Sequence, residues 1–155
     1  MKEARELVHG TCVALGPRAA LIRGRPGAGK SDLALRFIAL PAEGEFQPLL
    51  VADDQVFVET GANGVLRVSP PGSIAGKLEV RGLGILEVPF LDDAELVLVC
   101  DLVDGRDVSR MPPEQGELTR IAGLPVAAIK LAPFEASAPL KLKMALALAA
   151  RNNSN

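Results

Sequence analysis

Most of the chain consists of short apolar runs separated by turn residues. Runs of roughly four to eight apolar residues are typical of β-strands, and Gly16-Pro17-Arg18 and Asn63-Gly64 predict tight turns between neighbouring strands. The predicted strands lie at 9–15, 19–23, 49–54, 55–60, 65–69, 95–101 and 126–131, and the stretch 74–88 predicts two more around a tight glycine loop.

Two segments have helical spacing instead. In 31–40, the apolar side chains between Leu33 and Ile38 recur at i, i+1, i+4 and i+5, so they form one apolar face of a helix. A second helix is predicted to begin at Ser137, which can cap it, with Pro139 in the first turn, and to run to Arg151.

These elements predict an α/β fold, with a mixed β-sheet core and flanking helices. The chain has 155 residues, of which 48% are apolar and 23% are charged, and this composition is typical of one globular domain. We therefore expect a single domain over 1–155, with frayed ends at about 1–6 and 152–155.

The segment between the strand at 19–23 and the helix at 31–40 fits the phosphate-binding pattern G-x-x-x-x-G-K-[ST]. Its glycines let several backbone N–H groups face one anion, and the first turn of the following helix adds a partial positive charge. The lysine is suited to the terminal phosphates and the serine hydroxyl to Mg²⁺. The predicted loop consists of Gly24, Arg25, Pro26, Gly27, Ala28, Gly29, Lys30 and Ser31.

Two predicted strands end in carboxylates. The strand at 49–54 ends in Asp53 and Asp54, and the strand at 95–101 ends in Asp101. A strand that ends in Asp beside a phosphate loop commonly supplies a Mg²⁺ partner or a catalytic carboxylate. Two adjacent carboxylates can divide this work, because one can orient the metal while the other takes a proton. By spacing alone, a solvated turn at 53–54 and Asp101 as the metal-side group remain alternatives.

Composition argues against nucleic acid and membranes as partners. The net charge is −2 and only 3% of residues are aromatic, with no Trp or Tyr, so neither a basic face nor a stacking platform for nucleic acid is expected. Cys12 and Cys100 lie in apolar runs, which favours buried free thiols and a cytoplasmic protein. No apolar run is long enough for a membrane span, and residues 1–10 lack an apolar signal segment.

Four stretches together resemble the catalytic domain of HPr kinase/phosphorylase, a bacterial enzyme that modifies a serine of the phosphocarrier protein HPr. They are His9, the loop 24–31, Val51-Ala52-Asp53-Asp54, and the stretch 78–85 with the sequence LEVRGLGI, which is the most specific of the four. The resemblance extends from about His9 to Arg110. It implies a phosphate-loop fold of the PEP carboxykinase-like type.

The resemblance also implies roles for residues that spacing alone leaves open. His9, otherwise an ordinary residue at the edge of a strand, matches the active-site histidine of the family. The pair Asp53 and Asp54 matches a pair that contains the proton acceptor, and Asp53 is the favoured candidate. Glu79 matches a glutamate on the Mg²⁺ side, together with Ser31.

Arg110 is placed like an active-site arginine of the family, although a loop arginine is usually only solvated. Asp101 becomes a structural strand end. Three departures from the family pattern stand out. The common long form has a separate N-terminal domain, so this chain resembles the short form of some proteobacteria. The loop 41–48 is longer than usual, and 131–136 lacks the Gly and Arg that the family uses in its reverse reaction.

The function implied by the resemblance is an ATP- and Mg²⁺-dependent protein-serine kinase of an HPr-like phosphocarrier, which regulates the phosphotransferase system. The family also removes the phosphate by phosphorolysis and forms hexamers. Two alternatives are a phosphate-loop kinase of a small metabolite and a regulator that senses ATP without turnover. A metabolite kinase needs a basic lid, and the loop 103–115 is short and contains two adjacent prolines.

Overall fold

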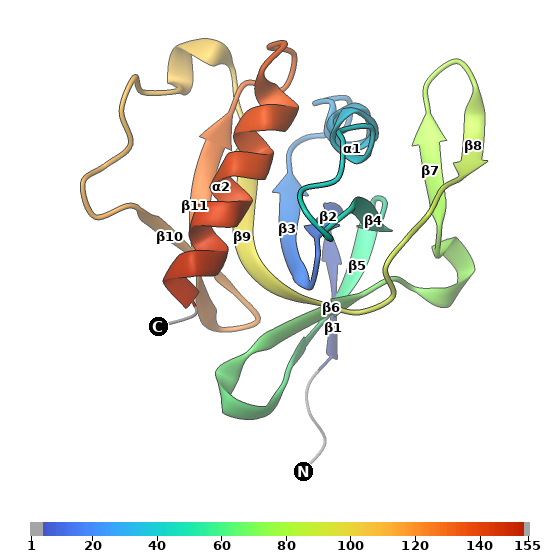
Figure 1. The fold of residues 1–155 in the computed structure, drawn as a ribbon, viewed down its shortest axis with the longest axis horizontal. Helices are drawn as coiled ribbons and strands as arrows, with labels where there is room; N and C mark the ends of the chain where they lie inside the picture. The colour runs from blue at the N-terminus through green and yellow to red at the C-terminus, as the bar shows by residue number, and fades with distance from the viewer. Residues whose placement is uncertain (1–4, 154–155) are drawn as a thin grey trace.

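The computed structural model describes residues 5–153 as a mixed β-sheet with two helices on one side and a separate hairpin beside it (Figure 1). The two α-helices are α1, Lys30–Ile38, and α2, Ala138–Asn153. Nine strands form the main sheet: β1 Arg5–His9, β2 Thr11–Leu15, β3 Arg18–Arg23, β4 Pro48–Ala52, β5 Gln55–Thr60, β6 Leu66–Ser69, β9 Ala94–Leu102, β10 Glu117–Ile121 and β11 Leu124–Leu131. The α/β fold with a mixed sheet that the sequence predicts is therefore confirmed.

Strand β9 organises the sheet. It runs parallel to β3 along one edge and parallel to β11 along the other, whereas its first residues pair antiparallel with β6. The strand order along the main path is β1-β5-β6-β9-β3-β2-β4. Because β3, β9 and β11 are parallel, their carboxyl ends at Arg23, Leu102 and Leu131 lie on the same edge, which is where α/β proteins usually bind ligands.

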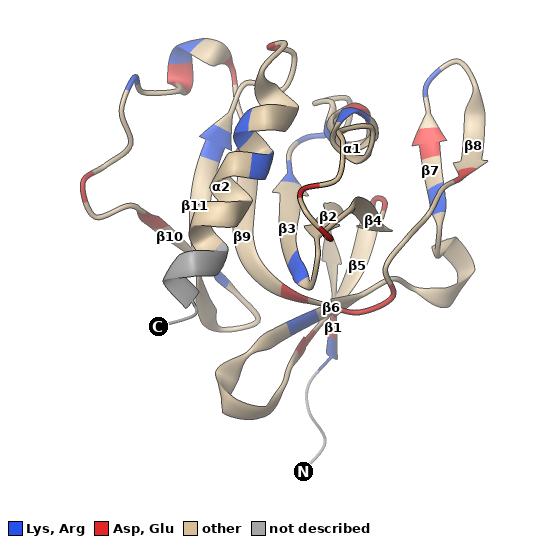
Figure 2. Cartoon of the chain, viewed as in Figure 1, with Lys and Arg blue, Asp and Glu red and all other residues tan. Residues whose placement is uncertain are grey.

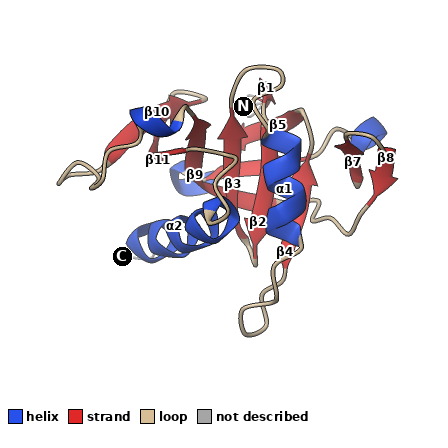
Figure 3. Cartoon of the chain, turned by 90° about the horizontal axis from the view of Figure 1, so that it is seen from above, coloured by secondary structure: helices blue, strands red, loops and turns tan. Residues whose placement is uncertain are grey.

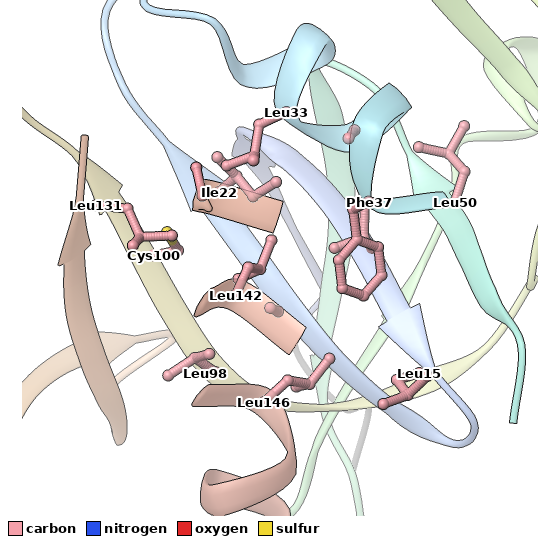
Figure 4. Packing of buried hydrophobic residues seen from close by; sticks show 14 of the residues in the cluster. Leu15, Ile22, Leu33, Phe37, Leu50, Leu98, Cys100, Leu131, Leu142 and Leu146 are labelled. Carbon is pink, nitrogen blue, oxygen red and sulfur yellow. The ribbon is translucent and has the colours of Figure 1, made fainter. Parts of the chain in front are cut away.

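A buried apolar cluster lies on each face of the sheet. Helices α1 and α2 lie on one face (Figure 3), where Phe37 and Leu33 of α1 and Leu142 and Leu146 of α2 pack against β-strand side chains such as Ile22 (Figure 4). The second buried cluster contains strand residues only, because the sheet curls so that its outer strands cover its other face. Alternate residues of β2 and β3 enter the two clusters, which explains why these strands are apolar throughout.

A two-stranded hairpin stands apart from the main sheet. Strands β7, Lys77–Val80, and β8, Gly84–Glu87, pair antiparallel and project beside α1 (Figure 1). Leu78 is fully buried in the cluster under α1 and anchors the hairpin. The strand, glycine loop and strand predicted within 74–88 are thus confirmed.

Three predicted boundaries differ from the structure. Gly10, at φ 148°, interrupts the strand predicted at 9–15, so that the chain before it forms the separate strand β1. Strand β1 begins at Arg5 and α2 ends at Asn153, so regular secondary structure extends into the segments predicted to fray, 1–6 and 152–155. The fraying stays a prediction, and the rest of those segments lies outside the described residues. Strand β10 was not predicted, because three of its five residues, Glu117, Thr119 and Arg120, are polar and leave no apolar run.

The helices are short relative to a bilayer. Over the part of the chain that the structure describes, neither helix is long and apolar enough to cross a membrane.

Candidate active site

The predicted phosphate loop connects β3 to α1 at the carboxyl edge of the parallel strands. Gly27 and Gly29 have φ values of 81° and 101°, which residues other than glycine rarely adopt. Gly29 caps α1, and its carbonyl accepts the N–H of Leu33 at 2.9 Å. Helix α1 therefore begins at the last residues of the motif, so its unpaired N–H groups face the loop as anion binding requires.

The side chain of Lys30 folds back onto the backbone of the loop. Its Nζ donates hydrogen bonds to the carbonyl oxygens of Gly24, at 2.8 Å, and Arg25, at 3.1 Å. The ammonium group is therefore held against the loop backbone, at the place where the phosphates of a nucleotide would lie.

Asp53 connects three elements. Its side chain is 7% exposed, and its Oδ1 accepts hydrogen bonds from the hydroxyls of Ser31 at 2.7 Å and Thr11 at 3.0 Å. Its Oδ2 accepts the backbone N–H of Glu79 at 3.0 Å. Asp53 thus ties the start of α1, the start of β2 and the hairpin strand β7 to the end of β4, and both its oxygens are already occupied as acceptors.

Asp54 faces the solvent instead. Its side chain is 71% exposed, and its Oδ1 lies 4.0 Å from Nδ1 of His9, whose side chain is 80% exposed. The backbone of Asp54 has a φ of 68°, a left-handed conformation, and its carbonyl accepts the N–H of Gly10 at 2.9 Å. A non-glycine residue in this conformation costs of the order of 1 kcal/mol and is frequent at functional sites.

A cavity of about 590 Å³ joins these parts. It extends from the phosphate loop to the hairpin, so that Lys30 and Ser31 share it with Asp54, Glu79 and Arg81. The structure therefore brings together residues that are widely separated in the sequence. The full lining is Thr11, Pro26, Gly27, Gly29, Lys30, Ser31, Asp32, Leu35, Asp54, Glu79, Val80, Arg81 and Phe134.

The donor set of this cavity suits Mg²⁺. The Ser31 hydroxyl, the Asp54 carboxylate and the exposed Glu79 carboxylate are oxygen donors, and Mg²⁺ usually takes one or two carboxylates and completes its shell with water and phosphate oxygens. The described residues hold no cluster of three or more His, Cys, Asp or Glu side chains that could bind a metal ion by themselves. A site completed by nucleotide phosphates fits both observations.

Charges of both signs surround the site. Figure 2 shows acidic and basic residues on the hairpin beside α1, and among them Glu79 and Arg81 line the cavity. Lys30 and Arg81 are its cations, and they face the carboxylates of Asp32, Asp54 and Glu79.

Arg110 and Asp101 do not line this cavity. Arg110 is exposed in the segment between β9 and β10 and lines neither this cavity nor the smaller one on the other side of the loop, so the structure does not bring it to the site. Asp101 binds Arg23 through two hydrogen bonds of 2.8 and 3.0 Å and has the structural role that the resemblance implies.

Sequence reasoning did not single out three residues of the site. Thr11 buries its hydroxyl against Asp53, Arg81 lines the cavity and Phe134 borders it. Arg81 lies within the stretch that carries the resemblance, so a closer comparison of that stretch could have identified it. No local pattern marks Thr11 or Phe134, because each reaches the site only through the tertiary fold.

The sequence matches a known protein family over more than half of its length. The chain matches the family model described as HPr Serine kinase C-terminal domain over residues 2–108. The HPr kinase/phosphorylase of Clostridium novyi is 40% identical over 91 residues, which cover 59% of this chain and 27% of the relative. That of Clostridium acetobutylicum is 34% identical over 129 residues, which cover 77% of this chain and 40% of the relative.

A solved structure has the same fold. It is that of the Hpr(Ser) kinase/phosphatase from Coxiella burnetii, with a TM-score of 0.75 at 22% identity, and the match covers 96% of this chain and 92% of that chain. The chain spans between 27% and 40% of the length of the two clostridial relatives. Because the family model matches more than half of the sequence, and the matched part contains the loop, the carboxylate pair and the hairpin, this chain belongs to the HPr Serine kinase C-terminal domain family.

Proposed function

We propose that this chain is an ATP- and Mg²⁺-dependent protein-serine kinase that phosphorylates an HPr-like phosphocarrier and thereby regulates the phosphotransferase system. The observation that carries the proposal is the cavity of about 590 Å³ in which the phosphate loop meets Asp54 and Glu79. A γ-phosphate on the loop and an incoming hydroxyl beside Asp54 would be neighbours in it. Family membership supports the choice of substrate.

The loop would bind the nucleotide tail. Backbone N–H groups around Gly27 and Gly29 and the start of α1 would face the phosphate oxygens, and Lys30 would exchange its loop carbonyls for the β- and γ-phosphates. Such groups supply positioning and charge neutralisation, which account for most of the rate in phosphoryl transfer.

Asp54 is the better candidate for the proton acceptor. The resemblance alone favoured Asp53, but both oxygens of Asp53 accept hydrogen bonds inside the protein, whereas Asp54 is exposed and lines the cavity. The serine Oγ of the substrate would give its proton to Asp54 as the Oγ–P bond forms and the bond between the γ-phosphorus and the ADP oxygen breaks. His9, 4.0 Å from Asp54, would orient that carboxylate.

Ser31 and Glu79 would hold Mg²⁺. A bound Mg²⁺ would neutralise charge on the β- and γ-phosphates and fix their orientation. Asp53 would act on this site through Ser31, because its carboxylate fixes the serine hydroxyl at the start of α1.

The surface beside the cavity suits a protein substrate. Leu83 and Ile85 of the hairpin are 71% and 70% exposed, next to Arg81 in the cavity wall. Exposed apolar side chains at the mouth of a charged site offer a protein contact area that a small metabolite would not use. This observation favours the phosphocarrier over a small metabolite as the acceptor.

Incubation with ATP, Mg²⁺ and a purified HPr protein tests the proposal. We expect phosphoserine on HPr by mass spectrometry, and no product with Lys30→Ala. ATP consumption without HPr but with small hydroxyl metabolites would identify a metabolite kinase instead, and ATP binding with no turnover of either kind would identify a sensor. Adding inorganic phosphate to the phosphorylated HPr tests the reverse reaction.

A further inference from the structure

A second cavity, of about 480 Å³, lies on the other side of the phosphate loop. It is formed where the segments after β9 and β11 leave the carboxyl edge of the sheet. The proposed roles of the loop, the carboxylates and Mg²⁺ do not involve this cavity. Its volume falls within the usual range of small-molecule sites, roughly 300–1,000 Å³. The lining consists of Arg25, Ala28, Leu102, Val103, Asp104, Gly105, Ala132, Pro133, Phe134 and Glu135.

The lining of this second cavity differs in kind from that of the first. Side chains of Leu102, Val103, Ala132, Pro133 and Phe134 give it an apolar wall. Its carboxylates, from Asp104 and Glu135, are exposed residues that already bind neighbouring cations. Arg25, at the side of the phosphate loop, is the one cation among the described lining residues. The rest of the lining, an apolar wall with two carboxylate acceptors, suits a flat ring with attached hydroxyls better than it suits phosphate.

Phe134 marks the boundary between the two cavities, because it lines both. Phe134 is 74% exposed, and a Cβ at Gly29 would come within 3.0 Å of its ring, so the ring lies directly against the phosphate loop. Among the described residues that line either cavity, Phe134 is the only aromatic one. A free aromatic face beside a phosphate loop can stack on a base.

The backbone around Phe134 is fixed from both helices. Arg36 of α1 donates to the carbonyl oxygens of Pro133 and Glu135, and Lys141 of α2 forms a 2.7 Å ion pair with Glu135. The ring is thus presented by an anchored segment, which lowers the entropy that binding must overcome.

We propose that the second cavity holds the nucleoside of the bound nucleotide, with the base stacked on Phe134. The inference rests on the proposed function, since it requires a nucleotide on the loop. Arg25 and Ala28 border this cavity, whereas Lys30 and Ser31 border the first, so a triphosphate that extends along the loop places its γ-phosphate beside Asp54. The carboxylates of Asp104 and Glu135 are acceptors for the ribose hydroxyls.

Calorimetric titration with Mg-ATP and with Mg-tripolyphosphate separates the contribution of the nucleoside to binding affinity from that of the phosphates. Phe134→Ala is expected to weaken ATP binding about 5- to 100-fold, which corresponds to the loss of one stacked base, and to leave tripolyphosphate binding within about 2-fold. Phe46→Ala is the matched control, since Phe46 is 41% exposed and lies against Gly16, at the opposite end of β3 from the loop. Phe134→Tyr should retain the affinity for ATP.

Fluorescence provides a second measurement. The chain has no Trp or Tyr, so Phe134→Trp introduces the only strong emitter, which ATP should quench and tripolyphosphate should not. Phe46→Trp should respond to neither ligand. If both ligands bind to the wild type but Phe134→Ala weakens neither, or weakens both equally, the nucleoside site is wrong and the kinase proposal stands. If the wild type binds neither ligand, both proposals fail.

Discussion

The hydroxyl of Ser31 lies 2.7 Å from Oδ1 of Asp53, so the first turn of α1 is bonded directly to the end of β4. These residues are 22 positions apart, and the long loop 41–48 lies between them. That loop does not disturb the bond, because Phe46 packs at Gly16, at the far end of β3 from the phosphate loop. The phosphate loop and the carboxylate pair therefore form one structural unit.

Substitution of Asp53 should mainly lower stability, whereas substitution of Asp54 should mainly lower activity. Asp53→Asn turns an amide N–H₂ toward hydrogen-bond donors in a buried setting and should lower the free energy of unfolding by about 1–3 kcal/mol. Asp54→Asn alters an exposed side chain and should change stability by less than about 0.5 kcal/mol, but it should slow transfer by about 10²- to 10⁴-fold. Urea unfolding and a phosphate-transfer assay of both variants measure the two effects.

The opposite pattern would refute the assignment of roles. If Asp54→Asn keeps near-wild-type transfer while Asp53→Asn, still folded, loses it, then Asp53 is the proton acceptor in spite of its occupied oxygens.

Lys30→Ala should weaken nucleotide binding and remove transfer. The substitution removes the cation that donates to the loop carbonyls of Gly24 and Arg25, and a charged contact to phosphate is worth about 1.5–3 kcal/mol, or roughly 10- to 150-fold in affinity. Calorimetry with Mg-ATP measures it. Lys143→Ala removes the same charge from α2, where Nζ contacts Glu43, and should leave affinity unchanged; equal loss in both would indicate a general charge effect.

Local sequence patterns predicted those elements that are marked by a short motif or a turn sequence. The motif 24–31 predicted a glycine-rich loop between β3 and α1, and Asn63-Gly64 predicted the turn between β5 and β6. Strand β10 escaped prediction because the polar residues Glu117, Thr119 and Arg120 interrupt its apolar ones, and the break at Gly10 escaped because apolar residues continue on its other side. Both features depend on strand pairing, which a linear pattern does not contain.

The parts of the site that are short motifs in the sequence could be predicted. The loop and the carboxylate pair are short motifs, and the structure brings them together as expected. The proposed division of roles between Asp53 and Asp54 could not be derived from spacing, because it depends on which side chain faces Thr11 and the hairpin. Arg110 was predicted as a site residue by resemblance alone, and it lines neither cavity.

Asp101 should matter for stability and not for catalysis. It forms a two-point ion pair with Arg23, and Arg23 also donates to Thr119 of β10 at 3.3 Å, so the group joins three strands. Both side chains are about one-third exposed, so Asp101→Asn should cost about 1 kcal/mol of unfolding free energy. Transfer at saturating ATP should remain near that of the wild type. A loss of transfer as large as that of Lys30→Ala, without unfolding, would assign Asp101 to the reaction.

The two thiols should be unreactive in the native protein and should make its stability fall at high pH. Cys12 and Cys100 are fully buried, and burial raises the pKa of both thiols well above the ordinary value. Above about pH 8.5, thiols of the unfolded chain release protons that the folded chain retains. The unfolded state then gains stability by up to about 1.4 kcal/mol per thiol for each further pH unit, whereas below that pH the thiols add no pH dependence.

Ellman's reagent and urea unfolding test this prediction together. Native protein at about pH 8 should show almost no reaction, and both cysteines should react in guanidinium chloride. The double variant Cys12→Ala and Cys100→Ala should lose part of the fall in unfolding free energy between about pH 7 and about pH 9.5 that the wild type shows. Rapid labelling of the native protein, or identical pH profiles of the two proteins, would mean that these thiols are open to solvent and that the two clusters on either side of the sheet are less tightly packed than their burial indicates.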